Sequence, residues 1–154
     1  MTFTLQLESE NILSDGLLDE IRRGCQSAMA RAFCQTAQNN LGEPPGEDRP
    51  TVWPDLSSSE RGLKYQKRVG RSIATLYETG ALSESIVVDE SAQPESASVV
   101  CESEYGYAHQ FGDSNTFLPA RPFFPMVGDE VTAYTSEKCL EAASEELNFI
   151  LNQN

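Results

Sequence analysis

His109 is the one histidine in this 154-residue chain, and few other side chains of the kind that do chemistry stand near it. An imidazole acts as a general base or a nucleophile when a partner activates it and a reacting group lies within hydrogen-bond reach. Asp113 and Ser114 follow closely, but no known nucleophile motif surrounds them. We expect a structural or interface role for His109, and a hydrolase centred on it stays as an alternative.

The four cysteines are widely spaced, and the sequence has no Cys-x-x-Cys pair or Cys/His cluster. Cys25 and Cys34 are nine residues apart, so on one helix they would lie on opposite faces and could not pair with each other. Together with Cys101 and Cys139 they are expected to be buried, reduced thiols. The glycines lack the spacing of a phosphate-binding loop. We therefore expect no metal, no nucleotide and no other cofactor.

The charge of the chain is strongly negative and unevenly spread, with a net value of -13. Residues 1–80 hold 9 Lys/Arg against 11 Asp/Glu, whereas residues 81–154 hold 2 against 13. Specific nucleic-acid binding is not expected, because contact with phosphates requires a basic surface. A chain divided in this way is suited to meeting copies of itself or another protein, basic part to acidic part.

The positive charge is concentrated in one stretch around residues 61–71. Arg61, Lys64, Arg68 and Arg71 follow one another at steps of three, four and three, which places them on one face of a predicted helix. One interpretation is an ordinary solvated helix face. The other is a cationic surface that pairs with acidic residues of a neighbouring subunit, and the net charge of the chain favours it.

The N-terminal part predicts a strand followed by a long helix. Phe3, Leu5 and Leu7 alternate with polar residues, which is typical of a short strand and not of a signal peptide. No run is long enough to cross a bilayer, so we expect a soluble protein with no membrane contact. Ser14 is a plausible N-cap for a helix that ends before Asn39. Its apolar stripe comprises Leu17, Leu18, Ile21, Cys25, Met29, Ala32 and Phe33.

A Pro/Gly-rich loop over residues 41–52 follows, and Trp53 is expected to anchor it in the core. Ser57 and Glu60 form a capping-box pattern for a second helix that ends at Gly80. Residues 85–88 and 97–101 are rich in β-branched side chains and predict two strands. The last helix is expected to begin near Thr135 or Ser136. Its predicted inward stripe comprises Leu140, Ala143, Leu147, Ile150 and Leu151.

These elements predict one α+β domain over residues 1–154. A small antiparallel sheet is expected to pack against the long N-terminal helix, a second helix and the C-terminal helix.

An aromatic and Pro-rich loop is expected over residues 105–125. Pro119 and Pro122 favour an extended backbone there and so present Arg121 in a fixed position at little entropy cost. Arginine and aromatic residues are enriched at interface hot spots. Of Phe123 and Phe124, we expect one to complete the core and the other to contact a partner.

Several ordered motifs resemble one family of proteins. They comprise Trp53-Pro54-x-Leu56-Ser57, Lys64, Leu76-x-x-Thr79-Gly80-x-Leu82-x-x-Ser85-Ile86, YAHQFG ending at Gly112 and LPARPFF starting at Leu118. In this order they resemble the phage virion-morphogenesis or tail-completion family, which includes Mu-like tail assembly proteins. The resemblance covers about residues 50–151. A polar stretch, Asp113–Thr116, stands where a glycine-rich turn is usual in the family.

The resemblance implies a non-enzymatic structural protein of a tailed phage or prophage. Such a protein completes the tail or joins it to the head at the neck, in the virion, after synthesis in the bacterial cytoplasm. It implies contacts with copies of itself in a ring and with neighbouring tail or neck proteins, and no small-molecule substrate. The predicted interface residues are Arg61, Lys64, Arg68, Arg71, His109, Phe111, Arg121, Phe123 and Phe124. A small acidic cytoplasmic interaction or regulatory module is the alternative.

Overall fold

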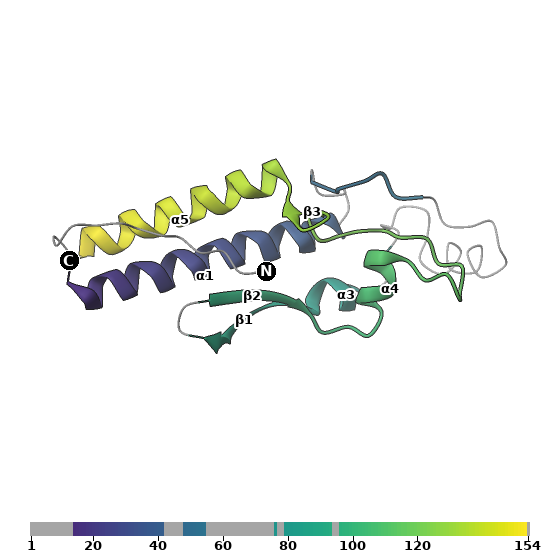
Figure 1. Ribbon diagram of the computed structural model, residues 1–154, viewed down its shortest axis with the longest axis horizontal. Helices are drawn as coiled ribbons and strands as arrows, with labels where there is room; N and C mark the ends of the chain where they lie inside the picture. The colour runs from purple at the N-terminus through teal and green to yellow at the C-terminus, as the bar shows by residue number, and fades with distance from the viewer. Residues whose placement is uncertain (1–13, 42–47, 55–75, 77–78, 94–95, 154) are drawn as a thin grey trace.

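The helix α1, Asp15–Asn40, runs through the middle of the molecule, as a computed structural model of the chain shows (Figure 1). The structure describes residues 14–41, 48–54, 76, 79–93 and 96–153. Helix α5, Ala133–Gln153, lies along one side of α1. The strands β1, Ile86–Gln93, and β2, Ser96–Cys101, lie on its other side. Among these residues the fold is α+β, as predicted.

Shorter elements connect these parts. Helix α3, Ala81–Glu84, precedes β1, and helix α4, Gly106–Phe111, follows β2. A small hairpin of β3, Met126–Val127, and β4, Glu130–Val131, leads into α5. Gly80, at φ 83°, adopts the left-handed conformation at the start of α3.

Helix α1 begins where the sequence predicts, but it continues through Asn39 and Asn40, past its predicted end. The hydroxyl of Ser14 accepts a hydrogen bond from the backbone N–H of Leu17 at 3.3 Å, and Asp15 places a negative charge at the positive end of the helix dipole. The helix ends at Asn40, and the following residue, Leu41, is buried.

The contact between α1 and α5 forms the first of two core clusters. Its buried residues are Ile21, Cys25, Met29 and Phe33 from α1 and Cys139, Ala143 and Ile150 from α5. The two helices approach closely at Gly24, where a Cβ atom would lie 2.8 Å from Cδ1 of Ile150. A glycine at this position therefore allows the two helices to pack at short range.

The sheet and the end of α1 form the second cluster. Antiparallel pairing sets Ile86 opposite Cys101 and Val88 opposite Val99, so these four side chains share the face toward α1. The buried residues of this cluster are Cys34, Ala37, Leu41, Trp53, Ile86 and Phe123.

Three of the thiols connect these layers. Cys25 donates to the carbonyl of Ala143 and Cys139 to that of Met29, each at 3.4 Å, while Cys34 donates to Ile86 at 3.4 Å on the opposite side of α1. Burial raises the pKa of Cys25 and Cys34, and it raises the pKa of Cys139 to about 11. All four cysteines are free, and Cys25, Cys34 and Cys139 are buried as expected, whereas Cys101 is only half-buried.

Asp48 joins the loop before Trp53 to the start of α5. Its carboxylate accepts hydrogen bonds from the hydroxyls of Thr132 and Thr135 at the first turn of that helix. The amide of Asn40 donates to the carbonyl of Asp48 at 2.8 Å and to that of Phe123 at 2.9 Å. The end of α1, this loop and the start of α5 are therefore held together by buried polar contacts.

Three predictions about elements need correction or stay open. Residues 106–111 form a helix within the predicted 105–125 loop, because the backbone bond from His109 N–H to Tyr105 C=O (3.0 Å) starts a turn there. On α5, Ala143, Leu147 and Ile150 face the core as predicted, together with Thr135 and Cys139. Leu140 and Leu151 do not, since they are 59% and 44% exposed. The predicted N-terminal strand and second helix lie outside the described residues, and so do Arg61, Lys64, Arg68 and Arg71.

Candidate interaction surface

Among the described residues, the most exposed aromatic side chains lie on α4 and in the turn after it. Tyr107 and Phe111, one helical turn apart, are 75% and 65% exposed, and their ring centroids are 4.8 Å apart. Tyr105 at the start of α4 and Phe117 in the following turn are exposed as well. We call Tyr105, Tyr107, Phe111 and Phe117 the aromatic surface. The paired rings of Tyr107 and Phe111 present apolar area to water, which is typical of a contact site.

The turn that carries Phe117 is held by hydrogen bonds at its base. Asp113 and Leu118 exchange two backbone bonds of 2.9 Å. The carboxylate of Asp113 accepts from the backbone of Asn115 at 2.9 Å and from the hydroxyl of Thr116 at 2.7 Å. The hydrogen bond from Thr116 and then that from Asn115 lower the pKa of Asp113. The turn is thus an ordered platform.

Phe117 occupies a conformation that a non-glycine residue rarely adopts. Its φ is 56°, and its side chain is 91% exposed, so no burial offsets the backbone strain within this chain. Such a conformation costs on the order of 1–3 kcal/mol. Gly112 begins the same turn at φ 78°, and a Cβ there would lie 3.0 Å from the Leu118 carbonyl. A strained, exposed phenylalanine at the tip of an ordered turn is suited to insertion into a partner.

The residues behind the aromatic surface bind it firmly to the core. The side-chain oxygen of Gln110 accepts from the backbone N–H groups of Phe123 and Phe124, at 2.9 Å and 3.1 Å. The N–H of Arg121 donates to the carbonyl of His109 at 2.7 Å. The YAHQFG and LPARPFF segments are therefore two halves of one structural unit.

The structure corrects the predicted presentation of Arg121. Its side chain is 3% exposed, and its Nε donates to the carbonyl of Pro54 at 3.1 Å. Trp53 donates to the carbonyl of Pro122 at 2.9 Å, and Arg49 lies 3.6 Å above the Trp53 ring. The 48–54 loop thus lies against the prolines, and the guanidinium points inward. This burial lowers the pKa of Arg121.

Of the two phenylalanines that follow, Phe123 completes the core as predicted, while the contact of Phe124 with a partner stays a prediction. Because Phe123 is fully buried, its predicted contact with another protein is wrong. Phe124 is half-buried and stacks on Phe33, with ring centroids 5.8 Å apart. Of the described residues predicted for an interface, Phe111 is the one that is largely exposed.

His109 is half-buried, and its Nδ1 has no hydrogen-bond partner among the described residues. Burial, and secondly the charge of Arg121, lower the pKa of His109, which favours the neutral imidazole. In the described part of the chain, no three His, Cys, Asp or Glu side chains are grouped as metal ligands. His109 therefore lies behind the aromatic surface, where its backbone carbonyl holds Arg121.

Sequence reasoning missed Tyr105, Tyr107 and Phe117 as exposed residues. The spacing of Tyr107 and Phe111 was available as a signal, since residues four apart share one face of a helix. For Phe117 the signal was an isolated aromatic residue in the polar stretch DSNTF.

No family model, curated protein or solved structure matches this chain. Among the described residues, no helix is both long and apolar enough to span a membrane.

Proposed function

We propose that this chain is a non-enzymatic structural protein of a tailed phage or prophage, which completes the tail or joins it to the head at the neck. The observation that carries the proposal is the joining of YAHQFG to LPARPFF through Gln110. These are the segments on which the resemblance to tail-completion proteins rests. Their inner residues build the core, and their outer aromatic residues are free to make contacts.

The aromatic surface is the proposed contact with a neighbouring subunit. Neighbours in a ring meet through two unlike surfaces, so the aromatic surface of one copy faces a different part of the next. The proposed partners are further copies of this chain and adjacent tail or neck proteins in the virion. The acidic C-terminal half adds an electrostatic preference for basic partners.

Removal of the gene from the phage or prophage that carries it tests this role. We expect cells to accumulate filled heads and unattached or unfinished tails, visible by electron microscopy, with few infectious particles. Supply of the intact chain from a plasmid should restore joined particles. Normal particle assembly without the chain would contradict the proposal.

The same experiment distinguishes a structural role of the chain from a regulatory one. A regulator would alter the amounts of phage proteins made, whereas a structural subunit leaves those amounts unchanged and alters their assembly. Immunoblots of head and tail proteins from the two strains provide this comparison.

A further inference from the structure

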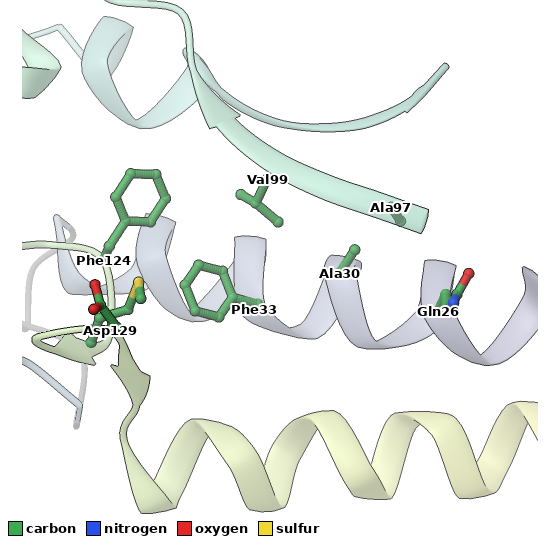
Figure 2. A pocket seen from close by; sticks show the side chains of 8 residues that line it. Gln26, Ala30, Phe33, Ala97, Val99, Phe124 and Asp129 are labelled. Atoms are coloured by element: carbon green, nitrogen blue, oxygen red, sulfur yellow. The ribbon is translucent and has the colours of Figure 1, made fainter. Parts of the chain in front are cut away.

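An apolar groove runs along α1 beside β2. Its volume is about 390 Å³. Figure 2 shows Gln26, Ala30 and Phe33 of α1 along its floor, and Ala97 and Val99 of β2 on the opposite side. Phe124 and Asp129 lie at one end of it in Figure 2, and Met126 also lines the groove. The groove is thus bounded by both layers of the core and has a largely apolar lining.

Within the described part of the chain, the edge of β2 along this groove has backbone groups that pair with no other strand. Glu102 donates its N–H to the carbonyl of Ser85 at 2.9 Å, and this bond sets the alternation of the β1–β2 ladder. Ser98 and Val100 then direct their backbone groups toward β1, while Ala97 and Val99 direct theirs away from it. Among the described residues, β2 pairs with β1 alone. This edge of β2 can therefore receive a further strand.

We propose that residues 3–7 of this same chain occupy the groove as a third strand, antiparallel to β2. Phe3, Leu5 and Leu7 alternate with polar residues, which is the pattern of a strand with one buried face. Their three apolar side chains would face Ala30 and Phe33, and their backbone would pair with that of β2. This inference does not depend on the proposed role in a virion.

The length of the preceding segment fits the distance to the groove. Gln26 lies about 17 Å along α1 from Asp15, and Phe33 lies about 27 Å along it, at 1.5 Å per residue. Residues 8–13, when extended, span about 20 Å, which brings Leu7 beside Gln26. Residues 7 to 3 then cover about 13 Å more, as far as Phe33. Ala97 lies near Gln26 in Figure 2, so the segment runs opposite to β2.

Amide hydrogen exchange of the intact chain tests the pairing, because the amides of adjacent β2 residues point to opposite edges of the strand. The Val100 amide points toward β1, and the Val99 amide points toward the groove. We expect the Val99 amide to exchange at least about ten-fold faster in a variant that lacks residues 2–9 than in the intact chain. The Val100 amide, which is bonded to β1, is the internal control, and the ratio of the two rates removes any general loss of stability. An unchanged ratio would overturn the proposal.

A matched pair of substitutions tests the orientation of the strand. Leu5→Asp places a carboxylate in the apolar groove that Asp129 borders, and should raise the exchange rate of Val99 relative to Val100. Gln6→Asp makes the same charge change on the opposite face of the strand and should leave the ratio unaltered. Equal effects of the two substitutions would contradict the predicted register.

Nuclear Overhauser contacts measured in the unaltered chain test whether residues 3–7 occupy the groove. We expect contacts from the Leu5 methyl groups to Val99 or Met126. In a mixture of isotope-labelled and unlabelled chains, these contacts should occur within one chain. Contacts found only between chains would identify the strand as a neighbour's and overturn the assignment to the same chain, and their complete absence would also overturn it.

Discussion

At the scale of single residues, Gln110 has the most extensive structural role near the aromatic surface, since one oxygen atom accepts two backbone hydrogen bonds. We predict that Gln110→Ala lowers the free energy of unfolding by about 2–3 kcal/mol, because two partly buried N–H groups lose their acceptor. Gln110→Glu retains an acceptor at the same position and should cost clearly less. Urea unfolding of the three proteins measures both effects, and equal losses would contradict the role assigned to this oxygen.

His109 predicts a pH dependence of stability with a definite sign. Its pKa is lowered in the folded chain, so the unfolded chain binds the proton more readily, and stability falls as the pH drops below about 6.5. Above that pH the neutral imidazole is present in both states and the contribution is constant. We predict that His109→Gln, which does not titrate, shows a smaller decrease in the free energy of unfolding between about pH 7.5 and pH 5.5.

Denaturant unfolding of both proteins at the two pH values checks this prediction. Carboxylates are shared by the two proteins, so their contribution cancels in the comparison. A steeper decrease for the glutamine variant would reverse the assigned sign.

At the scale of elements, Asp48 fixes the start of α5, because its carboxylate accepts hydrogen bonds from two threonine hydroxyls. We predict that Asp48→Ala lowers the free energy of unfolding by about 2 kcal/mol, because the buried hydroxyl of Thr135 loses its partner and the helix loses a favourable charge at its N-terminus. Glu137→Ala removes one exposed negative charge from the same helix and should have little effect. Thermal or chemical unfolding of the two variants distinguishes these outcomes, and similar losses would count against a specific role of Asp48.

The elements with strong local signals were predictable from the sequence. Ser14 and the apolar stripe after it predicted α1, and the β-branched residues predicted β1 and β2. Helix α4 was missed because it has six residues and no side-chain cap. The exposure of Leu140 was missed because the angular position of α5 is set by its contact with α1, notably at Gly24, and not by its own pattern.

The candidate surface was predictable only in part, for a related reason. The inward position of Arg121 depends on the loop around Trp53 and Pro54, about 67 residues away in sequence, so nothing local to LPARPFF reveals it. The exposure of Phe111 followed correctly from the prediction of a contact residue in HQFG, although its role in a contact stays a prediction.

At the scale of the whole molecule, self-association through the aromatic surface predicts a concentration-dependent mass in solution. We predict that Phe117→Ser weakens association by about ten-fold or more, because exposed aromatic anchors contribute strongly to binding. Phe149→Ser removes a 59% exposed phenylalanine from α5 and is the matched control. Light scattering over a range of protein concentrations measures both, and equal weakening would move the contact away from the turn.

Salt provides a second measurement on the same samples. If the basic and acidic parts of neighbouring chains attract each other, the oligomer should lose mass as the ionic strength rises, since exposed charges are screened. Mass that is independent of salt would leave the aromatic contact as the sole basis of association.

The buried thiols have a consequence for durability. Under the proposed role, the chain would meet dissolved oxygen in a released particle without the reductants of a cell, and oxidation of cysteine proceeds through the thiolate. Cys25, Cys34 and Cys139 are enclosed by helix and strand, and their raised pKa values keep them protonated at neutral pH. While the fold stays closed, these three sulfur atoms are protected from oxidation, which leaves the half-buried Cys101 as the thiol that oxidants reach most readily.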